Sequence, residues 1–141
     1  MANILVIEDQ DSLGSLYQRV LGSIGHGVTI AQTGLAAIVA VETRKPDMVF
    51  LDLLLPGMKA TEVVDRLTRL GVLPDSPLVL SSAMAQSKLA ALARNLGANH
   101  ILPNTLRHKV AIKLGEFPLA KNQGVTDRSL RGVHIALGRL S

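Results

Sequence analysis

Acidic side chains follow the first apolar run of the chain and interrupt the third. Glu8, Asp9 and Asp11 come directly after Asn3–Ile7, and Asp52 lies within the stretch MVFLDLLLPGM. Aspartate is depleted in strands, and burying a carboxylate without a partner costs free energy. A carboxylate in so apolar a setting therefore indicates a functional site.

The chemistry that fits these residues is binding of a divalent cation. Carboxylates from neighbouring strands would repel one another, and a cation removes that conflict. Oxygen ligands without histidine or cysteine favour Mg²⁺ or a similar hard ion. Simpler interpretations remain open: Asp11 as a helix cap or first-turn residue, Glu8 and Asp9 as solvated loop acids, and Ser82 as a partner for backbone groups.

Five short apolar runs alternate with segments of helical periodicity. The predicted strands are Asn3–Ile7, Gly27–Ala31, Asp47–Leu51, Pro77–Ser81 and Asn99–Leu102. Apolar spacings of three and four residues predict helices between and after them, one of which has Thr33 as its cap and carries Leu35, Ile38 and Val39. We therefore expect an α/β, flavodoxin-like, doubly wound fold: a five-stranded parallel sheet with helices on both faces and strands apolar throughout.

This topology predicts where the acids meet. Right-handed crossovers place the carboxyl ends of all parallel strands at one edge of the sheet. Ligands of open doubly wound sheets bind at that edge. Glu8, Asp9 and Asp52 should converge there, and Ser82 and Ala83 at the end of the fourth strand should lie beside them.

The composition sets limits on function. The chain has 141 residues and a mass of 15.0 kDa, which suits one domain with a single core. It has no cysteine, which excludes disulfides and thiolate metal sites and is typical of a reducing compartment. No basic leader precedes an apolar run, and no segment approaches the roughly 20 apolar residues that span a bilayer. We expect a cytoplasmic protein.

The basic character of the chain belongs to its C-terminal part. Residues 1–103 carry 8 basic and 9 acidic side chains, whereas residues 104–141 carry 7 and 2. Within the predicted tail 116–141, apolar residues at helical spacing predict an amphipathic helix over 127–140. With few aromatic residues for base stacking, the sequence argues against nucleic-acid binding.

The ordered set of motifs resembles the receiver domain of two-component response regulators. It comprises the acidic pair Glu8-Asp9, the run LDLLLPGM around Asp52, LVLSSA with Ser82 at the Ser/Thr position, and NLGANHIL. The resemblance covers about residues 2–115, so we expect a receiver domain over 1–115. Only about 26 residues follow, too few for a DNA-binding domain, so output is expected through protein–protein contacts, including a homodimer, or through another chain.

The resemblance implies specific roles. Asp52 would accept a phosphoryl group from a histidine kinase or a histidine phosphotransfer protein and signal to a downstream protein. Glu8, Asp9, Asp52 and the backbone carbonyl of Leu54 would hold Mg²⁺. Ser82 would bind the phosphoryl oxygens and shift on activation. Such a domain is not an enzyme beyond slow self-dephosphorylation.

Three positions differ from the pattern of this family. Asn104 stands where the family has a lysine that pairs with the phosphoryl group. Ile101 occupies the aromatic switch position, and Lys59 lies in the loop after the acceptor. Two further interpretations therefore stay open: a receiver-like interaction module that works without phosphorylation, and a flavodoxin-like small-molecule binder or enzyme at the same sheet edge.

Overall fold

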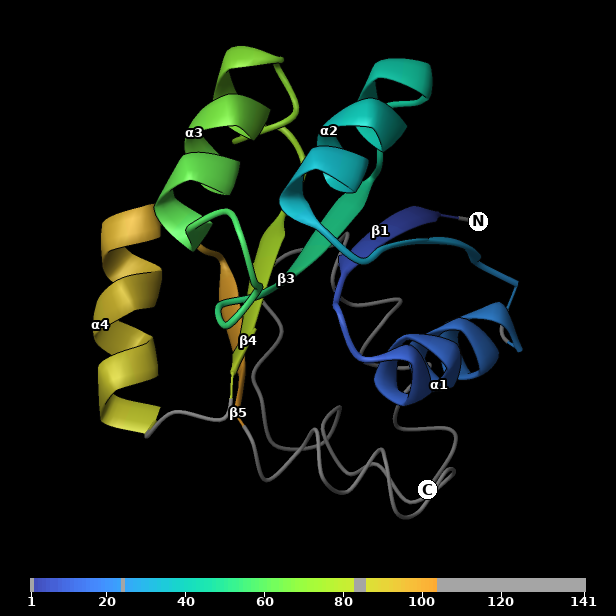
Figure 1. The fold of residues 1–141 in the computed structure, drawn as a ribbon, viewed down its shortest axis with the longest axis horizontal. Helices are drawn as coiled ribbons and strands as arrows, with labels where there is room; N and C mark the ends of the chain where they lie inside the picture. Colours follow the sequence, from blue (N-terminus) through green and yellow to red (C-terminus); the bar gives the residue numbers. More distant parts are fainter. Residues whose placement is uncertain (1, 24, 83–85, 104–141) are drawn as a thin grey trace.

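The computed structural model describes residues 2–23, 25–82 and 86–103 (Figure 1). Its strands are β1 (Asn3–Ile7), β2 (Gly27–Ala31), β3 (Met48–Asp52), β4 (Leu78–Ser82) and β5 (His100–Pro103). Its helices are α1 (Asp11–Gly22), α2 (Gly34–Thr43), α3 (Ala60–Arg69) and α4 (Gln86–Leu96). No helix in these ranges is long and apolar enough to cross a bilayer. The predicted fifth helix and the tail helix over 127–140 lie outside the described residues.

The strands form one parallel sheet in the order β2-β1-β3-β4-β5, which confirms the predicted fold class. Figure 1 shows α1 on one face of the sheet and α2, α3 and α4 on the other. Successive side chains of a strand point to opposite faces of the sheet, so alternate residues pack into the two cores between the sheet and its helices. Ile4, Val6 and Phe50 pack toward α1, whereas Leu5 and Leu51 belong to the core under α2, α3 and α4.

Strand boundaries differ from the prediction in a consistent way. The first two strands have the predicted bounds, and β3, β4 and β5 each begin and end one residue later. The shift matters because it makes Asp52 and Ser82 the last paired residues of β3 and β4. Both are polar residues that hydropathy alone assigns to loops.

The expectation that every strand is apolar and covered is wrong for β2. All five residues of β1, β3 and β4 are buried, whereas Gly27 and Thr29 of β2 are exposed. The reason is position: β2 is an edge strand of the sheet, so less of its surface is covered.

Helix α2 is capped as predicted, but of its predicted apolar residues Leu35, Ile38 and Val39 it buries only Ile38. The Thr33 hydroxyl accepts a hydrogen bond from the Ala36 amide at 3.0 Å, which confirms the N-cap. The predicted apolar residues Leu35 and Val39 are 62% and 64% exposed. The buried residues of α2 are Gly34, Ala37, Ile38 and Val41. An apolar helix has several faces of similar hydropathy, so packing rather than pattern decides which one meets the sheet.

His26 lies beside the start of β1, at the amino end of the strands. The Ala2 amide donates a hydrogen bond to Nδ1 of His26 at 3.0 Å, and the Gly27 amide donates to the Ala2 carbonyl at 2.9 Å. Nδ1 can accept this bond only when it carries no proton. Burial lowers the pKa of His26 below its ordinary value, which favours the same neutral form.

This histidine predicts a pH dependence of stability. Below about pH 6.5 the unfolded chain binds a proton at His26 more readily than the folded chain does. The free energy of unfolding should therefore fall as the pH is lowered through that value. We expect wild type to exceed a His26→Gln variant in stability at pH 7.5 and to lose that advantage toward pH 5.5. Urea unfolding of both proteins across this range checks it. A difference that is constant with pH would contradict the role of the neutral imidazole.

Candidate functional site

The register of the central strands aligns the candidate residues. Ile7 of β1 pairs with Leu51 of β3, so the residues that follow each, Glu8 and Asp52, come at the same level of the sheet. On the other side of β3, Asp52 itself pairs with Ser81 of β4. The carboxyl ends of three adjacent strands therefore meet where the sequence predicted a site.

Three carboxylates converge at this edge. Glu8, Asp9 and Asp52 each offer an oxygen, and these oxygens lie within 4.8 Å of one another. Glu8 is 1% exposed and Asp52 is 4% exposed, whereas Asp9 lies nearer to solvent. Carboxylates this close and this buried repel one another unless a positive charge or a proton compensates them.

Backbone amides fix the two buried carboxylates. The Gln10 amide donates to Oε2 of Glu8 at 3.3 Å, and the Leu54 amide donates to Oδ1 of Asp52 at 3.1 Å. Both donors lie two residues after their acceptor, in the loop that leaves the strand. Each loop therefore turns back over its own acid and orients the carboxylate.

The loop backbones are anchored to the neighbouring strands. The Glu8 amide donates to the Ala31 carbonyl at 2.9 Å, and the Leu53 amide donates to the Ser81 carbonyl at 3.0 Å. These bonds extend the sheet ladder by one residue on β1 and β3. The acids thus stand on rigid backbone rather than on free loops.

Asp11, the fourth acid of the sequence motif, lies outside this cluster among the described residues. It is the first residue of α1, and its Oδ1 accepts a hydrogen bond from the Gln32 side-chain amide. Gln10, not Asp11, occupies the N-cap position of α1, and its side chain makes no capping bond. The interpretation of Asp11 as a first-turn residue is confirmed.

The remaining predicted residues surround the cluster to different degrees. Ser82 is fully buried at the end of β4 and pairs in register with Pro103 of β5. Ile101 pairs with Leu80 and packs half-buried against the core. Lys59 is exposed at the N-cap position of α3, and Leu54 is 59% exposed. Ala83 and Asn104 lie outside the described residues.

One contact that sequence reasoning missed ties the acceptor loop to α2. A Cβ built on Gly34 would lie 2.7 Å from Sδ and 3.0 Å from Cβ of Met58, and 3.1 Å from Cγ2 of Val63. Gly34 is the first residue of α2, and Met58 belongs to the loop between β3 and α3. The signal in the sequence was the glycine directly after the Thr33 cap. The first position of a helix tolerates many residues, so a glycine there indicates that a neighbour approaches closely.

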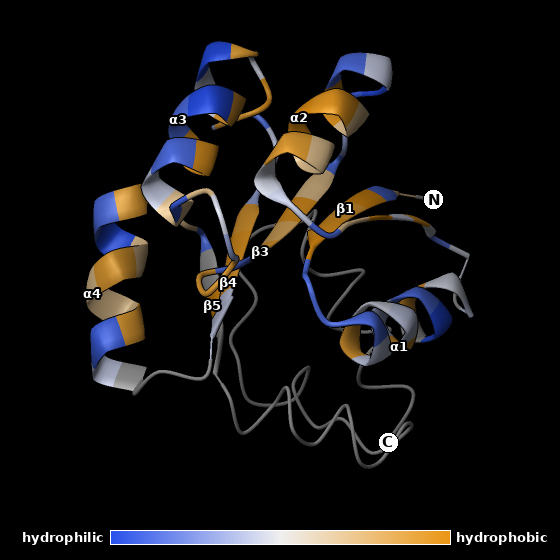
Figure 2. Cartoon of the chain, viewed as in Figure 1, coloured by the Kyte–Doolittle hydropathy of each residue, from blue (hydrophilic) through white to orange (hydrophobic). Residues whose placement is uncertain are grey.

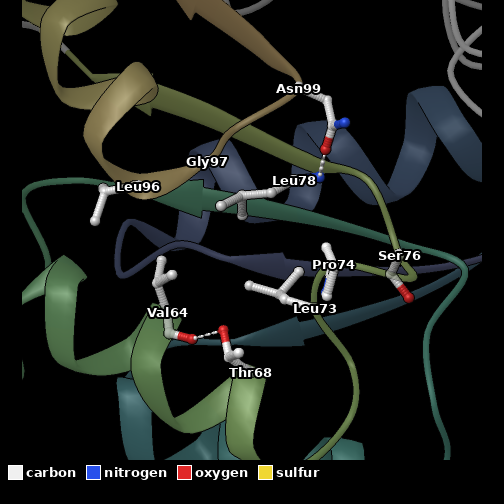
Figure 3. Close-up of a pocket in the computed structure, with 9 residues that line it drawn as sticks. All are labelled: Val64, Thr68, Leu73, Pro74, Ser76, Leu78, Leu96, Gly97 and Asn99. Atoms are coloured by element: carbon white, nitrogen blue, oxygen red, sulfur yellow. Dashed lines mark hydrogen bonds between the residues drawn. The ribbon is translucent and has the colours of Figure 1, made fainter.

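A cavity elsewhere in the described residues has no polar side chain free to bind a ligand. A cavity of about 240 Å³ lies between α3 and α4 near the amino ends of β4 and β5, with Val64, Leu73, Leu78 and Leu96 among its lining residues (Figure 3). The polar groups that border it are already engaged. The Thr68 hydroxyl donates to the Val64 carbonyl at 2.7 Å, and Asn99 Oδ1 accepts from the Leu78 amide at 2.8 Å.

Comparison with known proteins decides the family. A family model described as the response regulator receiver domain matches residues 4–112. This chain belongs to the response regulator receiver domain family. Receiver domains are signalling domains rather than classical enzymes, and they bind Mg²⁺ through acidic residues such as those clustered here. They interact with histidine kinases and with downstream targets.

Curated relatives support this assignment. The receiver domain is 32% identical over 96 residues to the alkaline phosphatase synthesis transcriptional regulatory protein PhoP of Bacillus subtilis, covering 68% of this chain and 39% of PhoP. It is 30% identical over 122 residues to the DNA-binding response regulator MtrA of Mycolicibacterium smegmatis, covering 85% of this chain and 51% of MtrA. The chain thus spans about half or less of the length of these relatives.

Solved structures show the same fold. The chemotaxis protein CheY4 of Vibrio cholerae superimposes with a TM-score of 0.70 at 19% identity, over 80% of this chain and 94% of CheY4. NtrX of Brucella abortus gives a TM-score of 0.68 at 26% identity, over 77% of this chain and 25% of NtrX. The flavodoxin-like topology is therefore shared with the matched parts of both proteins.

The contact between Gly34 and Met58 predicts the effect of a single methyl group. Gly34→Ala should destabilise the receiver domain by about 1 kcal/mol, because overpacking outweighs the gain in helix propensity at the first helical residue. The matched control is Gly22→Ala at the end of α1, where an added Cβ meets nothing within 4 Å.

Chemical denaturation of the two variants measures the difference. The double variant Gly34→Ala, Met58→Ala should recover part of the loss, since it removes the opposing side chain. Equal stability of Gly34→Ala and Gly22→Ala would show that the acceptor loop does not rest on α2.

Proposed function

We propose that this receiver domain accepts a phosphoryl group on Asp52. The observation that carries the proposal is the cluster of Glu8, Asp9 and nearly buried Asp52, with oxygens within 4.8 Å of one another. The cluster gathers carboxylate oxygens from two neighbouring strands around one strand-end aspartate.

The donor set fits a hard divalent cation. Within the described part of the chain the cluster offers three carboxylates and no nitrogen or sulfur ligand, the composition that Mg²⁺ prefers. We assign Glu8, Asp9, Asp52 and the backbone carbonyl of Leu54 as the residues that hold it. When bound, Mg²⁺ supplies positive charge that screens the carboxylates and the incoming phosphoryl oxygens.

Asp52 supplies the nucleophile. One carboxylate oxygen attacks the phosphorus of a phosphohistidine on the donor protein, the P–N bond breaks, and the imidazole nitrogen leaves with the electron pair and takes up a proton. The product on this chain is an aspartyl phosphate. The Leu54 amide holds Oδ1 of Asp52 at 3.1 Å and so limits rotation of the carboxylate before attack.

Residues around the cluster are assigned to the phosphorylated state. We assign Ser82 and the neighbouring Ala83 to the phosphoryl-binding and switch region at the end of β4. Asn104, an amide in place of the family lysine, offers only a neutral hydrogen bond, which is about half as strong as a charge-assisted one. Exposed Lys59 at the start of α3 is the candidate substitute cation. Ile101 cannot act as an aromatic switch because it has no polar tip.

The proposed partners follow from this reaction. A histidine kinase or histidine phosphotransfer protein donates the phosphoryl group, and a downstream protein reads the result through surface contacts, in the cytoplasm. We place the receiver domain at residues 1–115 and treat 116–141 as a separate basic tail. The relatives PhoP and MtrA are named as transcriptional and DNA-binding regulators. We do not propose that activity for this chain, because the matched region covers only 39% of PhoP and 51% of MtrA.

The first test is chemical phosphorylation. Incubation with Mg²⁺ and acetyl phosphate should add one phosphoryl group, about 80 Da in mass, to wild type and none to Asp52→Asn. The control Asp47→Asn alters an aspartate near the opposite end of β3, whose Oδ2 accepts a bond from the Asn3 amide, and should leave the labelling intact. Intact-mass spectrometry measures it. A wild-type protein that stays unlabelled would favour the interaction module that works without phosphorylation.

The second test concerns the metal alone. A ligand that binds only the folded state stabilises it, so Mg²⁺ should raise the melting temperature of wild type by a few degrees at a hundredfold excess over its dissociation constant. Asp9→Asn should lose this response, because one of the three carboxylates is removed from the cluster.

Asp11→Asn is the matched control, since Asp11 lies at the same edge but bonds to Gln32 instead of joining the cluster. Differential scanning calorimetry with and without Mg²⁺ distinguishes the variants. A response that survives Asp9→Asn but disappears with Asp11→Asn would refute the assigned ligand set.

A further inference from the structure

Helix α2 differs from a typical surface helix in its composition. Its sequence, GLAAIVAVET, contains one charged residue, Glu42, whereas α3 carries Glu62, Asp65, Arg66 and Arg69. Figure 2 shows the contrast: α2 is coloured for apolar residues over most of its length, while α3 shows hydrophilic residues. A helix that is apolar on all sides is normally covered on all sides.

The uncovered side of α2 is a stripe of two large residues. Leu35 and Val39 are 62% and 64% exposed and stand four residues apart, so they lie one above the other on the helix. The other large hydrophobic residues that are exposed in the described part of the chain, Leu54 and Leu70, stand singly in a loop and at a helix end. Beside the stripe, exposed Ala36 and half-buried Ala40 leave room for a second helix to approach.

The two ends of α2 carry complementary groups. Near its amino end, Asp11 accepts a hydrogen bond from Gln32, one residue before the Thr33 cap. At its carboxyl end stand Glu42 and the C-cap residue Arg44, both exposed. Lys45, the next residue, already forms an ion pair with Asp75 at 3.0 Å.

We propose that this face of α2 is a docking surface for a second copy of the same chain, with the two α2 helices antiparallel about a two-fold axis near Val39. In this arrangement the two Val39 side chains cover each other at the axis, and Leu35 of each copy lies beside them, opposite exposed Thr43 of the other copy. Arg44 of one copy lies toward Asp11 of the second copy, and Glu42 lies toward the positive amino end of the opposite helix. A parallel arrangement would place Arg44 beside Arg44 and Glu42 beside Glu42.

The size of the surface sets the strength of the dimer. A ten-residue helix is about 15 Å long and presents one short stripe, so the contact falls in the class of small, transient interfaces. Because the same patch serves both copies, the contact closes on itself and does not continue into filaments. The proposal concerns the exposed face of α2 and does not depend on phosphoryl transfer.

Absence of cysteine from the chain allows a direct test. A Val39→Cys variant places one thiol beside the proposed axis, where the two sulfurs can meet within disulfide range. Under mild oxidation at micromolar concentration, we expect it to form a covalent dimer at least about tenfold faster than a Thr61→Cys control, since contact raises the local concentration of thiol. Thr61 is exposed on α3, a different helix from the one that carries the stripe.

Sedimentation equilibrium of chains without cysteine provides an independent measure. Leu35→Glu should raise the dissociation constant of the dimer at least about tenfold, because it places a charge in the apolar contact. Leu70→Glu, which alters an exposed leucine at the end of α3, should leave it unchanged.

Three results would overturn the proposal. Equal cross-linking of Val39→Cys and Thr61→Cys excludes the two-fold contact. A wild-type chain that stays monomeric to millimolar concentration excludes self-association. A monomer in which the thiol of Val39→Cys reacts much more slowly with a maleimide than that of Thr61→Cys shows that a segment of the same chain, such as the tail 116–141, covers the stripe instead.

Discussion

The convergence of three carboxylates at one edge of the sheet is the constraint that the rest of the structure must satisfy. Two carboxylates that are almost fully buried, and a third beside them, hold their oxygens within 4.8 Å of one another. A flexible loop would relax by moving such charges apart. Here Asp52 is the last residue of β3, and Glu8 and Asp9 directly follow β1. The parallel register and the ladder hydrogen bonds of these strands oppose that movement. The apolar core beneath the strands stabilises the sheet that holds these acids together.

Two backbone amides show how local structure serves the cluster. Gln10 and Leu54 each donate to the acid two residues before them, so the turn that ends each strand also orients its carboxylate. The loop that carries Leu54 continues to Met58, which packs against Gly34 at the start of α2. Contiguous packing therefore connects the loop after Asp52 with α2, the helix whose exposed face lacks the usual charge.

Much of this arrangement follows from the sequence. The strands were predicted to within one residue because short apolar runs between turn residues identify buried strands, and Thr33 identified a helix start through its capping hydroxyl. The convergence of Glu8, Asp9 and Asp52 followed from chain topology alone, since parallel strands share one carboxyl edge. The exposure of β2, the exposed stripe of α2 and the contact of Gly34 with Met58 could not be predicted, because each depends on which neighbour lies beside the element.

The sequence by itself determined the class of the fold, the acids of the candidate site and the resemblance that the family comparison confirmed, because hydrophobic period and motif order are properties of the chain. Only the tertiary structure decided which face of α2 meets the sheet, how deeply Glu8 and Asp52 are buried, and that Asp11 stands apart from them. Burial and distance are set by packing between residues remote in sequence, and a linear pattern carries no record of them.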